Sequence, residues 1–355
     1  MSIAELARPE LRVLRPYEAA QQVDDTIRLN ANEAPWCSRA DRFRRPLNRY
    51  PEIRPRSLAT TLGKYFACDP ARLLVTRGTS EAIDLLIRAF CRAGRDNIVT
   101  TSPTFSMYGH YAIVQGAAQR SVETSPERNF EIDVDAILEA CDEQTRLIFI
   151  CSPNNPTGTL VPRPALLDLL ERRGDRSAIV VDEAYIEFSG EPSAVDLLER
   201  HPNLVVLRTL SKALAFAGAR CGTVMGPAEV IGILNAIQAP YAMSTPVVEC
   251  VEDALSSSAI DEAQARIAEI VAERERLMAA VASFRFVDTV WPSAANFFLF
   301  RADNGDVVVR RARENGILLR DFGASLPNCI RLTVGSKAEN ERLLTLFADM
   351  DKDES

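Results

Sequence analysis

The apolar positions of the chain alternate between two patterns over residues 56 to 225. Short apolar runs predict buried strands at residues 73–76, 98–101, 121–123, 147–151, 178–181, 204–207 and 221–225. Between them, apolar residues three and four positions apart, as at Ile83, Leu86, Ile87 and Phe90, predict helices. These helices cover residues 56–66, 83–90, 104–115, 134–140 and 163–173. The order favours an α/β fold with a mostly parallel sheet covered on both faces.

The pattern changes after Pro240. Two long helical stretches, residues 247–256 and 261–283, precede strands at 296–300, 317–320 and 329–334. Helices followed by short strands indicate a smaller α+β domain. Residues 16 to 55 are rich in proline, asparagine and arginine and predict an arm that wraps another surface. We therefore expect an N-terminal arm with part of the small domain (1–50), a large cofactor-binding domain (51–245) and a small C-terminal domain (246–355).

Composition narrows the class of protein. The chain has 355 residues, 47% of them hydrophobic and 25% charged, as is usual for a soluble globular protein. Its net charge of -8 and scattered arginines argue against a nucleic-acid partner. The two histidines and eight dispersed cysteines show no spacing typical of metal ligands, so we expect no metal site. We expect the cysteines to be reduced thiols. The first 22 residues contain no long apolar stretch, so we expect no membrane contact and a cytoplasmic location.

Residues with chemical potential follow the predicted strands. Parallel strands bring their carboxyl ends to one edge of a sheet, where ligands bind, so Gly78, Asn155, Asp182 and Lys212 should converge there. A partly desolvated Lys212 amine could form an imine with a carbonyl cofactor. Arg220, eight residues further on, could hold a phosphate. A phosphorylated aldehyde needs both groups.

These residues form a consistent set for pyridoxal phosphate. Asp182 can face the protonated ring nitrogen of that cofactor, which keeps the ring an electron sink. The phenolic oxygen could accept hydrogen bonds from Asn155 and Tyr185. The remaining candidates are Phe105 to stack on the ring and, for the phosphate, Gly78, Thr79, Ser80, Thr209, Ser211 and Arg220. Taken singly, Lys212 would more often be a solvated loop lysine.

Several segments jointly resemble the fold type I pyridoxal-phosphate aminotransferases, and within them the branch that acts on histidinol phosphate. The matching segments are residues 30–33, 49–52, 152–158, 181–188, 208–222, 240–246 and 330–335. They extend over nearly the whole chain in the order of that family. Two positions depart from it: Ser80 stands where an aspartate is common, and Phe105 where a tyrosine is common.

The resemblance implies roles for individual residues. Lys212 would carry the Schiff base and move the proton at the substrate α-carbon, while Asp182 and Tyr185 would complete the catalytic set. Tyr50 would reach the cofactor phosphate of the neighbouring subunit, which implies a homodimer. Substrate anions would be bound by Tyr17, Asn155, Arg320 and Arg331.

Three hypotheses about the function remain open at this point, the second of which covers two related enzymes. The resemblance favours amino transfer between L-histidinol phosphate and 2-oxoglutarate, in histidine biosynthesis. An aromatic amino acid aminotransferase or a decarboxylase of a phosphorylated amino acid could use the same cofactor residues, because the segments around Lys212 bind cofactor and not substrate. A non-catalytic ligand sensor is a third alternative, against which Lys212, Asp182 and Arg220 argue.

Overall fold

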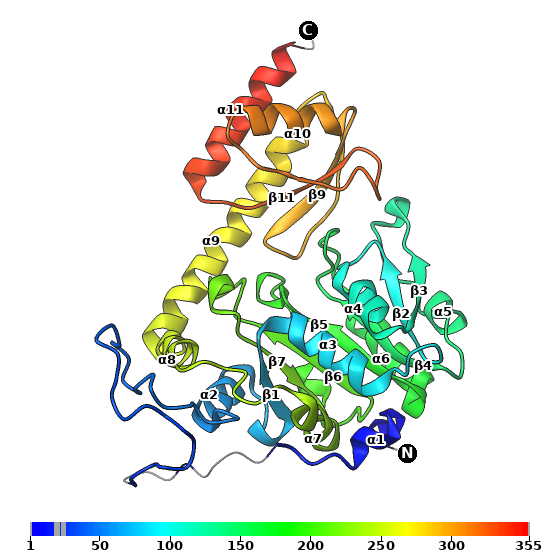
Figure 1. Cartoon of the computed structure of the whole chain (residues 1–355). Helices are drawn as coiled ribbons and strands as arrows, with labels where there is room; N and C mark the ends of the chain where they lie inside the picture. Colours follow the sequence, from blue (N-terminus) through cyan, green and yellow to red (C-terminus); the bar gives the residue numbers. More distant parts are fainter. Residues whose placement is uncertain (1, 18–21, 23–25, 354–355) are drawn as a thin grey trace.

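The protein has two sheets that lie in separate parts of the molecule, as seen in a computed structural model (Figure 1). The structure describes all residues except 1, 18–21, 23–25 and 354–355. A seven-stranded sheet forms the lower part in Figure 1, and a four-stranded sheet forms the upper part. Among the described residues, no helix combines the length and apolar composition needed to cross a membrane.

The larger sheet has the strand order β1-β7-β6-β5-β4-β2-β3. Its strands are β1 (Leu73–Thr76), β2 (Asn97–Ser102), β3 (Ala118–Glu123), β4 (Thr145–Cys151), β5 (Ala178–Asp182), β6 (Leu204–Thr209) and β7 (Gly222–Met225). Strands β3, β2, β4, β5 and β6 are parallel, which confirms the predicted fold class. β7 pairs antiparallel with both β1 and β6, because the chain returns from β6 through a loop instead of a crossover helix.

Helices cover both faces of this sheet, and each strand supplies side chains to both cores. In β4, Ile148 and Ile150 belong to one apolar cluster, and Leu147 and Phe149 belong to the other. This alternation explains why the strand is apolar at every position from Leu147 to Cys151. The first face packs against α2 (Arg56–Phe66), α6 (Arg163–Arg173) and α8 (Thr245–Ala254), and the second against α3 (Gly78–Phe90), α4 (Met107–Gln115) and α7 (Ala228–Ile237).

The smaller sheet is antiparallel, with the order β10-β11-β9-β8. Its strands are β8 (Val287–Val290), β9 (Phe297–Ala302), β10 (Arg320–Asp321) and β11 (Cys329–Thr333). Phe298 and Phe300 of β9 pack with Phe347 in the core of this part. The covering helices are α9 (Ser257–Val281), α10 (Gly305–Glu314) and α11 (Lys337–Asp353). Helix α9 extends from the lower to the upper part in Figure 1.

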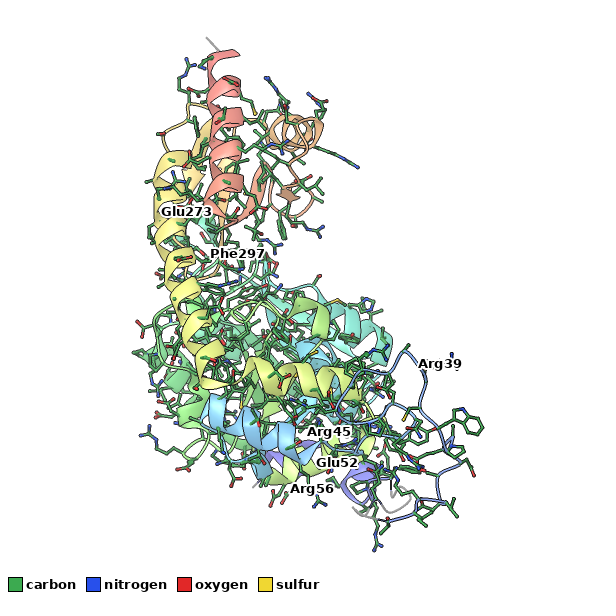
Figure 2. All side chains as sticks on the ribbon, turned by 90° about the vertical axis from the view of Figure 1, so that its left-hand side faces the viewer. Arg39, Arg45, Glu52, Arg56, Glu273 and Phe297 are labelled. Carbon is green, nitrogen blue, oxygen red and sulfur yellow. The ribbon has the colours of Figure 1, made fainter. Side chains whose placement is uncertain are left out.

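The N-terminal segment contacts the large part first and then extends along its surface. Ile3 and Ala7, beside α1 (Pro9–Arg12), are buried in the same core as α3 and α7. Further along, the buried Glu249 of α8 accepts hydrogen bonds from the backbone N–H groups of Arg44 and Arg45. Figure 2 shows Arg39 and Arg45 in this segment, away from Phe297 at the base of the upper part. The domain limits at residues 50 and 245 stay a prediction.

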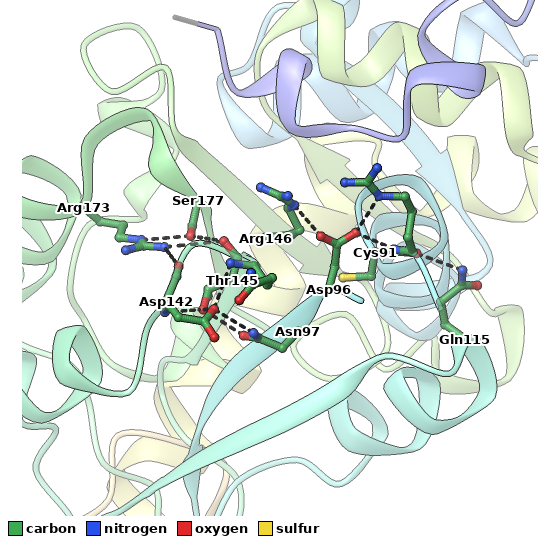
Figure 3. A network of polar contacts seen from close by, with 11 residues as sticks. Cys91, Asp96, Asn97, Gln115, Asp142, Thr145, Arg146, Arg173 and Ser177 are labelled. Carbon is green, nitrogen blue, oxygen red and sulfur yellow. Dashed lines mark hydrogen bonds and ion pairs between the residues drawn. The ribbon is translucent and has the colours of Figure 1, made fainter. Parts of the chain in front are cut away.

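A polar network fixes the amino-terminal ends of the strands (Figure 3). The buried Asp96 carboxylate pairs with the guanidinium groups of Arg92 (3.0 Å) and Arg146 (2.9 Å). Burial alone would raise the pKa of Asp96, but hydrogen bonds from Arg92 and the charge of Arg146 lower it below the usual value. A parallel sheet has its ligand-binding edge at the opposite ends of the strands, so this network stabilises the fold and leaves that edge open.

The prediction of individual elements fails in identifiable places. Residues 317–320 were expected to form a strand, but only Arg320–Asp321 pair, as β10. Helices α7, α10 and α11 and strand β8 were not predicted. In α7 nearly every position is apolar, so its residues show no amphipathic pattern that distinguishes a helix from a buried strand.

Candidate active site

A cavity of about 460 Å³ opens at the carboxyl ends of the parallel strands. Asp182 closes β5, Asn155 follows β4, Lys212 follows β6, and Thr79 and Ser80 begin α3. The smaller part adds Arg320, Phe322 and Arg331 from β10, the following turn and β11. The other lining residues are Thr104, Phe105, Ser106, Cys151, Ala184, Tyr185, Thr209, Ser211, Ala217 and Arg220. Both parts of the molecule thus contribute to one site.

Lys212 projects its amine into this cavity. Its Nζ lies 5.8 Å from the centre of the Tyr185 ring. The residue is exposed to solvent, and the cavity walls beside it remove part of the hydration of its amine. Burial, followed by the charges of Arg331 and Arg220, lowers the pKa of Lys212. A larger fraction of the amine is therefore uncharged and nucleophilic than for a lysine in water.

Asp182 presents a buried carboxylate to the same cavity. Its Oδ2 accepts a hydrogen bond of 2.9 Å from the hydroxyl of Tyr108, while its Oδ1 has no hydrogen-bond partner among the described residues. Burial raises the pKa of Asp182 to about 6, partly opposed by the hydrogen bonds from Tyr108 and the backbone of Ala184. A buried carboxylate oxygen without a partner is suited to a cationic N–H donor of a ligand.

Arg220 approaches the first turn of α3. Gly78 begins that helix with φ +74°, and a Cβ built on it would lie 2.6 Å from Nη2 of Arg220. Thr79 and Ser80, with backbone N–H groups at the helix N-terminus, line the cavity beside it. Across the loop, the Thr209 and Ser211 hydroxyls are hydrogen-bonded at 2.9 Å. This corner combines a guanidinium, hydroxyls and a helix N-terminus, which suits a phosphate.

Two further guanidinium groups line the cavity from the smaller part of the molecule, those of Arg320 in β10 and Arg331 in β11. Arg331 donates a hydrogen bond to Oδ1 of Asn155 and packs over Phe297 (5.1 Å) and Phe322 (5.6 Å). Burial lowers the pKa of Arg331, and the charge of the neighbouring Arg320 lowers it further. Two cations that repel each other inside a cavity favour binding of an anion between them.

The structure brings most of the predicted site residues together. The cavity is lined by Thr79, Ser80, Phe105, Asn155, Asp182, Tyr185, Thr209, Ser211, Lys212, Arg220, Arg320 and Arg331, with Gly78 directly behind Arg220. Within one chain Tyr17 and Tyr50 lie outside it. Tyr17 is 60% exposed, and Tyr50 is 49% exposed and stacks on Tyr241 at 4.7 Å. The roles assigned to these residues stay predictions.

The sequence reasoning missed several residues of the site. Thr104, Ser106, Cys151 and Phe322 line the cavity, and Tyr108 holds Asp182 from behind. Tyr108 lies within a predicted helix, where an aromatic residue usually indicates core packing. The signal for Thr104 and Ser106 was their position, since they follow β2 at the same sheet edge.

The fold and this cavity define a fold type I enzyme with a site for pyridoxal phosphate. The family model of aminotransferase class I and II matches residues 18–347. A structure of histidinol-phosphate aminotransferase from Sinorhizobium meliloti in complex with pyridoxal-5'-phosphate is similar, with a TM-score of 0.79 and 22% identity, covering 87% of this chain and 84% of the other.

Curated relatives are closer in sequence. The histidinol-phosphate aminotransferase of Aeromonas hydrophila is 41% identical and covers 99% of each chain. That of Xylella fastidiosa is also 41% identical, over 98% of this chain and 97% of the relative. The chain belongs to the aminotransferase class I and II family and, within it, to the histidinol-phosphate aminotransferases. It is therefore an enzyme that depends on pyridoxal phosphate.

Proposed function

We propose that the protein transfers an amino group between L-histidinol phosphate and 2-oxoglutarate, as a step of histidine biosynthesis. The observation that carries this proposal is the combination, in one cavity, of the Lys212 amine, the unpartnered Oδ1 of Asp182 and the paired guanidinium groups of Arg320 and Arg331. The shared sequence with the relatives described above supports the same substrate.

The cofactor fits the residues that line the cavity. Asp182 would pair with its ring nitrogen, Asn155 and Tyr185 would contact its phenolic oxygen, and Phe105 would pack against its ring. Its phosphate would be held by the corner formed by Gly78, Thr79, Ser80, Thr209, Ser211 and Arg220. When bound, pyridoxal phosphate supplies an aldehyde that joins to amines and a ring that withdraws electrons from the substrate α-carbon.

Lys212 would carry out the proton transfer. Its Nζ reaches the cavity from the loop after β6, and its lowered pKa lets it take a proton from the substrate α-carbon and return it on the cofactor side. The Tyr185 ring lies beside this amine, with its centre 5.8 Å from Nζ. Burial and two nearby guanidinium groups shift the Lys212 amine toward its neutral form.

Arg320 and Arg331 would bind the substrate anions in turn. Histidinol phosphate brings a phosphate and 2-oxoglutarate a carboxylate, and a guanidinium fork accepts either. The Phe297 and Phe322 rings beneath Arg331 keep that side chain in place. One anion site could thus serve both half-reactions.

The half-reaction of each amino donor tests the proposal. The protein loaded with pyridoxal phosphate is mixed with histidinol phosphate, phenylalanine or threonine phosphate, without an acceptor, and the absorption of the bound cofactor is followed. We expect histidinol phosphate to convert the cofactor fastest. Conversion by phenylalanine alone would favour an aromatic aminotransferase, and release of carbon dioxide from threonine phosphate would favour a decarboxylase.

We also propose a homodimer in which Tyr50, and with it Tyr17, serves the cavity of the partner subunit. In one chain the segment before α2 leaves apolar side chains uncovered: Ile27 is 88% exposed, Leu29 91% and Trp36 73%. A second copy could cover them. Glu33 accepts hydrogen bonds from Arg49 and from the Tyr50 backbone, so Tyr50 is held in position.

Mixed dimers test the shared site. Lys212→Ala and Tyr50→Ala proteins are each expected to have little activity. After joint unfolding and refolding, a hybrid has one cavity with both an intact Lys212 and an intact Tyr50, so activity should return. The matched control mixes Lys212→Ala with itself. A mixture that stays inactive, or a monomer in sedimentation, would contradict the proposal.

We further place the enzyme in the cytoplasm. All eight cysteines are free thiols, and four of them, Cys91, Cys151, Cys221 and Cys329, are buried. Reduced buried thiols are typical of cytoplasmic proteins. Fractionation of cells that produce the protein is the direct test, and recovery outside the cytoplasmic fraction would contradict this location.

A further inference from the structure

Tyr108 is buried behind the cavity and hydrogen-bonded to one of its central residues. Its hydroxyl donates to Oδ2 of Asp182 at 2.9 Å, and its side chain has no solvent exposure. The other carboxylate oxygen, Oδ1, is buried and has no partner in the part of the chain that the structure describes. A carboxylate with one oxygen fixed by a hydrogen bond has a defined orientation, so the contact determines where Oδ1 points.

Packing holds Tyr108 rigidly. Its ring stacks on Phe149 of β4, with ring centres 4.7 Å apart, and meets the edge of Phe105 at 5.7 Å. Phe105 also lines the cavity. Tyr108 therefore touches both the ring that borders the cofactor site and the carboxylate at its inner end. The position of Phe105 and the orientation of the Asp182 carboxylate therefore both depend on Tyr108.

We propose that Tyr108 is the positioning residue for Asp182. By donating to Oδ2 it leaves Oδ1 for the ring nitrogen of pyridoxal phosphate and favours the ionised carboxylate that this nitrogen requires. The inference rests on the cofactor site of the proposed function and does not depend on which amino donor the enzyme uses. Tyr108 itself contacts neither cofactor nor substrate in this assignment.

The other groups near Asp182 do not titrate in the same range. Burial raises the pKa values of the Cys151 thiol from β4 and of the Tyr108 and Tyr185 phenols, so all three stay neutral. Lys212, whose pKa is lowered, faces the same cavity. A change in the charge of Lys212 affects the parent and a Tyr108 variant equally. Its effect therefore cancels in the ratio of their affinities for pyridoxal phosphate.

The test compares cofactor affinity at two pH values. Tyr108→Phe removes the hydroxyl and keeps the ring against Phe149. Without that donor Asp182 is harder to ionise, so we expect affinity for pyridoxal phosphate to fall about tenfold near pH 6 and clearly less near pH 8, where the carboxylate is ionised in both proteins. Equilibrium titration of the cofactor-free proteins, followed by cofactor absorption, measures this ratio.

Two controls separate this effect from a general loss of structure. Tyr111→Phe removes a hydroxyl from the same helix α4 and should leave affinity unchanged at both pH values. In an Asp182→Asn background, Tyr108→Phe should add no pH-dependent loss, because no carboxylate remains to titrate. Should Tyr108→Phe not fold, Tyr108→Gln, whose amide keeps an N–H donor that does not titrate between pH 6 and pH 8, should fold and keep the parent's pH dependence.

The possible results separate the role of Tyr108 from the proposed amino-transfer function. Equal loss at both pH values, the same loss in Tyr111→Phe, or a pH-dependent loss in the Asp182→Asn background would overturn the role of Tyr108. Because binding and not turnover is measured, these results do not depend on histidinol phosphate being the substrate. A failure of the proposed function would appear instead in the half-reaction with that donor.

Discussion

Gly78 and Arg220 approach so closely that a methyl group has no place between them. A Cβ on Gly78 would lie 2.6 Å from Nη2 of Arg220, and Gly78 also has a positive φ of 74°. The two residues come from different strands, β1 and β6, by way of the turns that follow them. The sharp turn before α3 thus creates the space that the guanidinium occupies.

Gly78→Ala is expected to weaken cofactor binding by at least tenfold, because Arg220 must move away from the phosphate corner. Titration with pyridoxal phosphate measures the change. Gly94→Ala is the matched control, since Gly94 also has a positive φ, of 67°, but nothing lies within 4 Å of its Cβ position. Equal weakening in both variants would mean that backbone strain, and not Arg220, is responsible.

Asp182 should make the stability of the cofactor-free protein depend on pH. Its pKa, about 6 in the folded protein, is about 3.9 in an unfolded chain. The folded protein therefore binds more protons between these values, and the free energy of unfolding should fall by about 3 kcal/mol as pH rises from about 4 to about 6. Urea unfolding of the parent and of Asp182→Asn checks this, and an unchanged profile in the variant would contradict it.

Arg320→Met should raise KM for both histidinol phosphate and 2-oxoglutarate by about tenfold or more, since the proposed anion site would serve both. Cofactor affinity should stay unchanged, because Arg320 belongs to the smaller sheet and not to the corner around Arg220 that would hold the cofactor phosphate. Arg301→Met is the control: Arg301 also packs over an aromatic ring, Trp291, but does not line the cavity. A rise in KM for one substrate only would show that the anions bind at different places.

Asp96→Ala should destabilise the fold and spare the site. The carboxylate is 1% exposed, and its loss leaves Arg146 without its ion-pair partner. We expect the free energy of unfolding to fall by about 3 kcal/mol, measured in urea. The absorption and affinity of bound pyridoxal phosphate should not change, because this network lies at the other end of the strands. A loss of cofactor affinity would contradict that separation.

Sequence reasoning located the site because the chemistry follows the strands. Asn155, Asp182 and Lys212 each come after an apolar run. Because parallel strands share one ligand-binding edge, the sequence alone predicted that these three residues lie close together. Tyr108 was missed because its contact with Asp182 depends on how α4 packs on β4, which helical periodicity does not specify. The direction of β7 was not predictable either, since an apolar run reads the same in a parallel and an antiparallel strand.

The role of Tyr50 could not be predicted from the local sequence. Nothing in its neighbourhood indicates which subunit it serves, and in one chain it lies outside the cavity, stacked on Tyr241. Only the resemblance suggested a partner subunit. Residues that complete a site across an interface carry no local pattern, because their contacts belong to another chain.

The covalent attachment of pyridoxal phosphate to Lys212 is the central claim. The chain has four lysines, and the other three, Lys64, Lys337 and Lys352, lie in α2 and α11. The direct measurement is borohydride reduction of the cofactor-loaded protein, followed by peptide mass spectrometry. The account predicts a pyridoxyl group on the peptide that contains Lys212 and none in Lys212→Ala. A stoichiometric pyridoxyl group on any of the other three lysines would contradict it.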